Sequence, residues 1–261
     1  MAPGRVGRAI LTLAVLSCVA TACSTNSTSK RTSSSTGSSP PSTITALGDS
    51  VPRGTNCDCS PYPQLSADGL TATTGDAVTA HNDAVGGATT SSVLRQLQSD
   101  TKVIDDVRAA NTVEIEIGAN DVAHSRSCGT DAACYEQRLP AIRKNLAAIV
   151  TRVHELADGH KLLVVLLDYW SVWLGGQYAA AQGEAYVAAA EQVTDEVNTI
   201  IKETATRDGS AYVDLRDAFK GPNYAYDETH YLSNDGDHPN AAGHRKIASA
   251  AEAVIEKALH I

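Results

Sequence analysis

Residues 161–167 read Lys-Leu-Leu-Val-Val-Leu-Leu, and this unbroken apolar run decides the class of fold. A run without polar alternation is typical of a strand that is covered on both faces. Strands of that kind occur in parallel sheets with helices packed on each side. The run therefore predicts a buried strand of an α/β domain.

Four weaker strand signals and three helix signals surround this run. The other strands are expected at 43–47, 77–81, 112–117 and 211–213. Helices are expected at 139–156, where apolar residues recur at intervals of three and four, and at 182–204 and 241–260. Because strands and helices alternate, the sequence predicts a parallel sheet of five strands within one domain, residues 42–261.

The strand expected at 112–117 carries two acidic residues that do not fit a buried position. Glu114 and Glu116 alternate with apolar residues, and this period of two indicates one solvated face. A strand inside a parallel sheet has no solvated face, so both carboxyl groups require a partner or a raised pKa. The sequence identifies no partner for either group.

The charge balance narrows the classes of partner. The chain of 261 residues contains 21 Lys and Arg against 30 Asp and Glu, a formal net charge of -9. Binding to a nucleic acid needs clustered positive charge that neutralises phosphates. We therefore expect no nucleic-acid partner.

The first 41 residues are expected to lie outside the folded domain. Residues 1–22 combine a positive start with a short apolar stretch, as in a bacterial export signal. Ala20-Thr21-Ala22-Cys23 resembles a lipobox and predicts lipidation of Cys23, with Cys18 as a weaker alternative. Residues 23–41 are rich in Ser and Thr and predict a flexible linker. We expect an exported protein anchored to the outer face of the cell membrane; plain secretion is the alternative.

Four further cysteines are Cys57, Cys59, Cys128 and Cys134. An even number in an exported chain predicts two disulfides. The preferred pair is Cys128–Cys134, which closes a short loop; a strained Cys57–Cys59 bond and cross-pairing between the two loops are both open. No histidine lies at ligand spacing near either pair, so a zinc site is the less favoured reading and no metal is expected.

Three polar blocks follow the expected strands, at the carboxyl ends where open α/β sheets bind ligands. Gly48-Asp49-Ser50 can present a hydroxyl, and Gly118-Ala119-Asn120-Asp121 can present an amide donor. Residues 84–90, Ala-Val-Gly-Gly-Ala-Thr-Thr, can bring a backbone N–H close to a substrate. Each block alone fits an ordinary turn with a helix cap equally well.

A fourth block, Asp235-Gly236-Asp237-His238-Pro239-Asn240, supplies a base. An Asp three residues before a His can accept the imidazole Nδ1–H, which leaves Nε2 to take a serine proton. Asp227-Glu228-Thr229-His230 has the same spacing. The later pair is preferred because Pro239 and Asn240 suit the start of a helix, and Asp227 and Glu228 are expected to face water.

These blocks, in this order between Thr43 and about His244, resemble the SGNH hydrolases, also called the GDSL esterase/lipase superfamily. The resemblance implies a flavodoxin-like three-layer α/β/α sandwich on a five-stranded parallel sheet, in agreement with the strand count above. Val51 departs from the usual Leu after the serine, and the two cysteine loops look like additions.

The same resemblance implies a role for each block. Ser50 would be the nucleophile, His238 the base and then the acid, and Asp235 the residue that orients His238. The backbone N–H groups of Ser50 and Gly87 and the Asn120 amide would form the oxyanion hole. The implied activity is hydrolysis of a carboxylic ester through an acyl-enzyme, with no metal or organic cofactor.

Both tryptophans of the chain lie directly after the 161–167 run. Trp170 and Trp173 are predicted to wall the acyl or alcohol pocket, and the alternative is that they only cover the core. The natural ester, whether a small molecule, a lipid or a sugar ester, and the oligomeric state stay open.

Two other functions also stay open. A binding lipoprotein would keep the fold without catalysis. A deacetylase or acyltransferase acting on cell-envelope polysaccharide would use the same serine with another substrate or acceptor.

Overall fold

The computed structural model describes residues 41–261. The expected export signal, the lipidation site at Cys23 and nearly all of the linker lie outside the described residues, so those assignments stay predictions. Within residues 41–261, no helix combines the length and the apolar character that crossing a membrane requires.

The centre of the domain is a sheet of five parallel strands in the order β2-β1-β3-β4-β5. All five predicted strands are present, with small differences at their ends. They are β1 (Thr43–Gly48), β2 (Thr79–Asn82), β3 (Thr112–Glu116), β4 (Leu163–Leu167) and β5 (Ala211–Val213).

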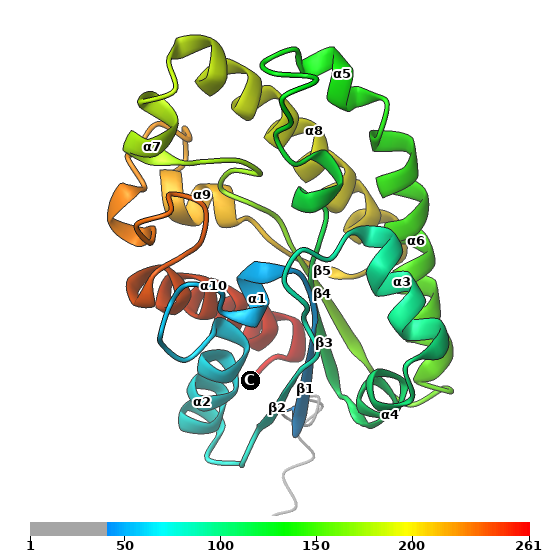
Figure 1. The fold of residues 1–261 in the computed structure, drawn as a ribbon. Helices are drawn as coiled ribbons and strands as arrows, with labels where there is room; N and C mark the ends of the chain where they lie inside the picture. Colours follow the sequence, from blue (N-terminus) through cyan, green and yellow to red (C-terminus); the bar gives the residue numbers. More distant parts are fainter. Residues whose placement is uncertain (1–40) are drawn as a thin grey trace, which may run out of the picture. The chain divides into compact units, whose positions relative to one another are not determined.

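Helices cover both faces of the sheet, which confirms the predicted three-layer α/β/α sandwich (Figure 1). One face is covered by α2 (Tyr62–Thr74) and α10 (Ala241–Leu259). The other is covered by α3 (Thr90–Ser99), α4 (Thr101–Ala109), α6 (Leu139–Leu156) and α8 (Glu184–Asp208). Short elements are α1 (Ser50–Arg53), α5 (Ala132–Glu136), α7 (Gly176–Ala180), α9 (Leu215–Lys220) and the 3-10 turns η1 (Ala119–Val122) and η2 (Thr229–Tyr231).

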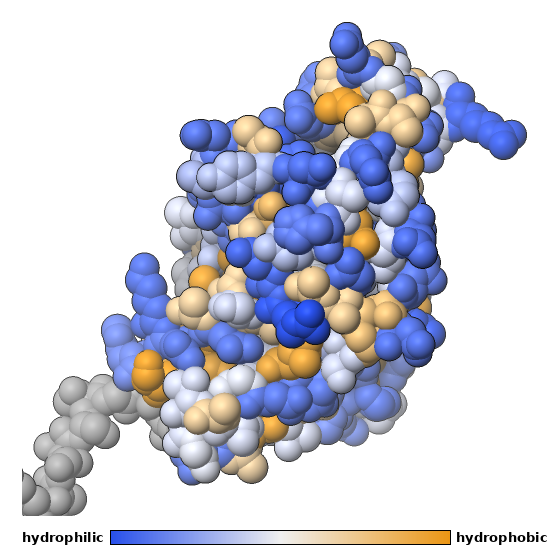
Figure 2. Space-filling model, turned by 90° about the vertical axis from the view of Figure 1, so that its left-hand side faces the viewer, coloured by the Kyte–Doolittle hydropathy of each residue, from blue (hydrophilic) through white to orange (hydrophobic). Residues whose placement is uncertain are grey.

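The core lies between these layers and follows the sequence pattern. The apolar stripe predicted on α6 is buried, as are the inner residues of β4. Figure 2 shows one outer face of the domain, on which hydrophobic residues lie in small groups among hydrophilic ones. The chain contains only one Phe and one Met, and its core consists mainly of Val, Leu, Ile and Ala, with a few large aromatic residues.

Both disulfides join cysteines of one loop. Cys57 bonds to Cys59 and Cys128 bonds to Cys134, so cross-pairing between the loops is wrong. His244 of α10 offers a ring nitrogen within 4.8 Å of both sulfurs of the first pair. The sequence spacing gave no sign of this proximity, because the fold brings α10 against the loop from far along the chain. Both sulfurs are already bonded to each other in the disulfide.

The two acidic residues of β3 are fully buried. Glu114 and Glu116 each have 0% of their surface exposed and point toward the layer of α2 and α10. The hydroxyls of Ser66 and Tyr62 lie beside them, but within residues 41–261 no group is in hydrogen-bonding geometry with either carboxyl. Of the two solutions that the sequence left open for Glu114 and Glu116, a partner or a raised pKa, the structure therefore favours the raised pKa.

Burial shifts both acids toward their neutral form. Desolvation, with a smaller contribution from the charge of Glu252, raises the pKa of Glu114 to about 8. Desolvation and the negative charge of Asp49 raise the pKa of Glu116 well above its usual range. A protonated carboxyl costs much less to bury than a carboxylate, so the central strand tolerates both residues at neutral pH.

These raised pKa values make the stability of the domain depend on pH. The folded protein holds the Glu114 proton to about pH 8, whereas the unfolded chain releases it near 4.5. In that window the unfolded state binds fewer protons, so the free energy of unfolding falls as pH rises, by at most about 1.4 kcal/mol per pH unit for each such group. We expect Glu114→Gln to make this fall shallower when urea unfolding is measured from about pH 5 to 8.

The matched control is Asp76→Asn, which neutralises an exposed acid near the end of α2. It should leave the pH dependence of unfolding as it is in the natural chain. Parallel curves for the natural chain and Glu114→Gln would contradict a neutral, buried Glu114.

Candidate active site

The Gly48-Asp49-Ser50 block forms the junction of β1 and α1. Gly48 has φ of 153°, and a Cβ atom there would lie 2.2 Å from the carbonyl oxygen of Glu116 on the neighbouring strand. Only glycine fits this approach. Asp49 caps α1 by accepting the Val51 N–H at 3.1 Å, and Ser50 is the first residue of the helix. The turn thus serves as a helix cap and also places Ser50 at the carboxyl edge of the sheet.

Asp49 is held in place by a tyrosine that follows β4. The Tyr169 hydroxyl donates to Asp49 Oδ2 at 2.7 Å, and Asp49 is 1% exposed. Burial raises the pKa of Asp49 to about 6, although the bonds from Tyr169 and from the Val51 N–H act to lower it. The sequence gave no sign of this contact, because Tyr169 lies far along the chain from the serine block.

The predicted contact between His238 and Asp235 is present. His238 Nδ1 lies 2.7 Å from Asp235 Oδ2, whereas Asp237 Oδ2 is 3.9 Å from the same nitrogen. Asp235 Oδ1 accepts the backbone N–H groups of Asp237 and His238 at 3.0 and 3.1 Å. Because Nδ1 faces Asp235, the other ring nitrogen, Nε2, is the one that can take a proton from a nucleophile.

The Asp235 carboxyl stays ionised. Partial burial acts to raise its pKa, but hydrogen bonds from the Asn56 side chain, from the N–H and ring of His238 and from the Asp237 N–H lower it to about 2. A carboxylate at this position can stabilise a positive charge on the neighbouring imidazole.

Hydrogen bonds of Asn240 join the segment that carries His238 to α10. The Asn240 side chain accepts the N–H groups of Ala242 and Gly243 and donates to the Leu232 carbonyl at 2.9 Å. Leu232 also forms a β-bridge with Pro239. As the sequence indicated, the segment after His238 begins the last helix, and it thereby fixes where the imidazole lies.

The alternative Asp227–His230 pair does not form. Asp227 accepts the Thr229 N–H at 2.9 Å, and the His230 ring packs on Tyr231 with centroids 3.8 Å apart. The expectation that Glu228 faces water is wrong: it is 2% exposed and accepts the Gly176 N–H at 2.9 Å. The Glu228 carboxylate is bonded to the backbone at the start of α7. Because the two groups lie far apart in the chain, their spacing in the sequence does not predict this bond.

The two blocks expected to stabilise an oxyanion are bonded to each other. Asn120 Nδ2 donates to the Ala88 carbonyl at 3.0 Å, and the Asp121 carboxylate accepts the Thr90 N–H at 2.9 Å and its hydroxyl at 2.7 Å. Gly87, with φ of 77°, is an exposed residue of the same loop. These bonds place the 84–90 loop beside the loop that follows β3.

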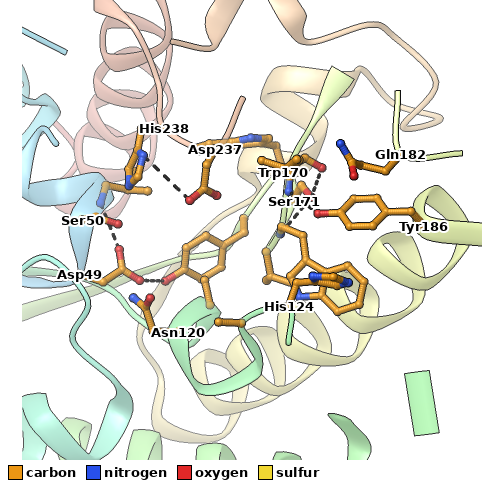
Figure 3. Close-up of a pocket in the computed structure, with 17 residues that line it drawn as sticks. Asp49, Ser50, Asn120, His124, Trp170, Ser171, Gln182, Tyr186, Asp237 and His238 are labelled. Carbon is orange, nitrogen blue, oxygen red and sulfur yellow. Dashed lines mark hydrogen bonds and ion pairs between the residues drawn. The ribbon is translucent and has the colours of Figure 1, made fainter. Parts of the chain in front are cut away.

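A cavity of about 340 Å³ lies at this edge of the sheet. Ser50, Asn120 and His238 line it together, whereas Gly87 is not among its lining residues in the described part of the chain. In Figure 3, Ser50 and His238 lie next to each other at one end of the pocket, and Gln182, Tyr186 and His124 lie at the other. The fold thus brings three of the four predicted blocks to one cavity.

Both tryptophans line the cavity and also pack into the core. Trp170 stacks on Phe219 with centroids 4.4 Å apart, and Trp173 donates from Nε1 to the Val122 carbonyl at 2.8 Å. The Trp173 ring also contacts His124 and Tyr186. The two interpretations of these residues are therefore compatible, because each indole presents one part to the core and another to the pocket.

Several lining residues were missed by the sequence analysis. His124 lies three residues after the Gly118-Ala119-Asn120-Asp121 block, and this short separation is a sequence signal for it. Gln182 and Tyr186 come from the segment around the start of α8, and only the fold brings them to the cavity.

Known proteins share the sequence pattern and the fold of this chain. Residues 46–246 match the model of the GDSL-like Lipase/Acylhydrolase family. A search among curated proteins finds no match. Among solved structures, the lipase Lip_vut3 from a goat rumen metagenome has a TM-score of 0.66 and 22% identity, covering 81% of this chain and 96% of that one.

Two further structures share the fold. The acetylxylan esterase Axe2 from Geobacillus stearothermophilus has a TM-score of 0.59 and 20% identity over 84% of this chain and 95% of its own. A lipase/acylhydrolase from Enterococcus faecalis has a TM-score of 0.56 and 21% identity over 83% and 96%. With the family match covering most of the chain, this protein belongs to the GDSL-like lipase/acylhydrolase family and is a carboxylic ester hydrolase.

Proposed function

We propose that this chain is a serine esterase in which Ser50 is the nucleophile, His238 the general base and Asp235 the residue that orients His238. The observation that carries the proposal is the meeting of Ser50, Asn120 and His238 at one cavity, with the His238 ring bonded to an ionised Asp235. An imidazole held in this way by a carboxylate is the arrangement that activates a serine hydroxyl.

The reaction would proceed in two halves. Ser50 Oγ attacks the acyl carbonyl carbon while His238 Nε2 takes the hydroxyl proton, and the tetrahedral intermediate collapses as His238 protonates the leaving alkoxide. Water then attacks the acyl-enzyme, His238 takes a proton from it, and Ser50 is released with its proton restored. Asp235 stays charged throughout and stabilises the imidazolium that forms in each half.

The negative oxygen of the intermediate needs hydrogen-bond donors. The candidates are the Ser50 N–H in the first turn of α1, the Asn120 amide and the Gly87 N–H. One Asn120 N–H bonds to the Ala88 carbonyl, which orients the amide and leaves its second N–H for a substrate. Each such donor typically contributes about 3 kcal/mol to the transition state.

The size of the cavity favours a small acyl group. Its volume of about 340 Å³ is near the lower end of the range for ligand pockets. Tyr186, His124 and Gln182 lie at the end away from Ser50, and the Trp173 ring contacts the rings of His124 and Tyr186. We therefore infer that short acyl esters are better substrates than long-chain lipids.

The direct test is hydrolysis of p-nitrophenyl esters from acetyl to palmitoyl. We expect turnover with a preference for the short esters, and Ser50→Ala should lower kcat by at least about 10⁴-fold because no other hydroxyl replaces the nucleophile. Ser99→Ala, at the exposed end of α3, is the control and should behave as the natural chain. Full activity in Ser50→Ala would exclude the proposed nucleophile, and ligand binding without turnover would favour the non-catalytic alternative.

The pH profile tests the base. Asp235, with a pKa lowered to about 2, stays ionised across the working range. We expect kcat/KM to fall on the acid side as His238 takes a proton and can no longer accept one from Ser50. A profile that is flat from about pH 5 to 8 would count against His238 as the base.

Deacetylation of a sugar ester is the second candidate. The polar lining of His124, Gln182 and Asp237 beside the aromatic rings offers hydrogen bonds to hydroxyl groups. The related fold of the acetylxylan esterase from Geobacillus stearothermophilus points to the same substrate class. Acetylated xylo-oligosaccharides in the ester panel separate the candidates, because a sugar deacetylase should prefer them to p-nitrophenyl acetate.

The tryptophans test the pocket wall. Trp173→Phe and Trp170→Phe each replace a lining indole by a smaller aromatic ring that can still pack in the core. If the replaced ring bounds the acyl group, we expect kcat/KM to shift severalfold in favour of longer acyl chains. The measurement is the ratio of hexanoyl to acetyl ester hydrolysis in each variant. An unchanged ratio in both variants would show that the tryptophans serve only the core.

A further inference from the structure

Asn56 lies in the loop between α1 and α2 and reaches the loop of His238. Its backbone is in the left-handed region, with φ of 59°, which Asn tolerates better than most residues. The residue before Asn56 bonds back to α1, because the Thr55 N–H donates to the Ser50 carbonyl at 3.0 Å. Directly after Asn56, the Cys57–Cys59 disulfide cross-links the loop. Asn56 is thus presented from a short, doubly restrained segment.

Two hydrogen bonds join Asn56 to the segment around His238. Asn56 Nδ2 donates to Asp235 Oδ2 at 2.5 Å, and the Ser233 hydroxyl donates to the Asn56 carbonyl at 3.1 Å. The Ser233 N–H in turn donates to the His238 carbonyl at 2.8 Å. Side chain and main chain of Asn56 therefore both contact the loop that carries the proposed base.

The amide completes the set of donors around Asp235. One carboxylate oxygen accepts two backbone N–H groups of its own loop. The other accepts His238 Nδ1 and Asn56 Nδ2. Without Asn56, this second oxygen would be held only by the ring that it is meant to orient. A carboxylate bonded on both oxygens by groups other than the imidazole keeps its plane fixed while the imidazole gains and loses a proton.

We propose that Asn56 is a positioning residue, which fixes the plane of the Asp235 carboxylate and joins the segment of Ser50 to the segment of His238. The inference rests on the proposed function, because it needs Asp235 and His238 to take part in proton transfer. It adds a residue outside the four sequence blocks that define the family resemblance. Asn56 acts through Asp235, and within residues 41–261 neither residue is among those that line the cavity.

The test separates the amide from the turn conformation. Asn56→Gly removes the donor but keeps a backbone that adopts positive φ without strain. Asp58→Gly is the matched control, because Asp58 has φ of 51° in the same loop and its side chain makes no hydrogen bond within residues 41–261. Both variants are assayed with p-nitrophenyl acetate for kcat and KM and across the acid limb of the pH profile.

We expect Asn56→Gly to lower kcat about tenfold or more with KM changed by less than about twofold, since the lost bond is to a charged group and does not touch the substrate. The acid limb of the pH profile should move to higher pH. Without the Asn56 hydrogen bond, the negative charge of Asp235 Oδ2 stabilises the protonated imidazole more strongly. Asp58→Gly should change neither quantity by more than about twofold. The other ionisable groups near His238, which are Asp237, Asp49 and His244, are the same in both variants.

Two results would overturn the inference. The first is an Asn56→Gly variant with the natural kcat and an unmoved acid limb. The second is an equal loss in Asp58→Gly, which would assign the effect to the turn. If Asn56→Gly folds poorly, Asn56→Asp keeps the shape of the side chain and cannot donate when ionised, so it should lose at least as much activity. Ser50→Ala and His238→Ala, assayed alongside, identify a failure of the proposed function itself, because they would then retain turnover.

Discussion

The close approach of Gly48 to the carbonyl of Glu116 is the contact on which the site depends. Gly48 is paired with Glu116 in the register of β1 and β3, and no side chain fits between them. The chain leaves β1 toward Ser50 and leaves β3 toward Asn120 at the same edge of the sheet. A larger residue at position 48 would push the two strand ends apart and separate the hydroxyl from the amide. The later segments, including the His238 loop, are assembled around this pair of strand ends.

The interior beneath the site is unusually acidic, and this has a consequence for the whole domain. Asp49, Glu114 and Glu116 are buried between β1, β3 and the layer of α2 and α10, and burial raises the pKa of each. At neutral pH Glu114 and Glu116 hold protons, which limits their repulsion with each other and with the Asp49 carboxylate. Helix α10 covers these acids and also begins just after His238. The same helix therefore contributes both to the stability of the interior and to the position of His238.

The sequence predicted the fold and most of the segments that line the candidate site, because both follow local patterns. The 161–167 run, the glycine at the end of β1 and the Asn240 cap are local signals, and each element is present. The remaining features depend on contacts between distant segments. The hydroxyl that fixes Asp49, the amide of Asn56 and the burial of Glu228 all come from pairs far apart in the chain, for which residue type and spacing carry no information. For Glu114 and Glu116, the alternation in the sequence indicates a conflict with a buried strand, and only the burial of both side chains in the fold shows that protonation resolves it.

In the proposed reaction one serine hydroxyl, that of Ser50, becomes covalently bonded to the acyl group. Incubation of the protein with a fluorophosphonate, followed by peptide mass spectrometry, tests it most directly. We expect one adduct per chain, on Ser50, and a much slower reaction in His238→Ala. An adduct on another residue, or no adduct on a folded protein that still hydrolyses esters, would contradict it.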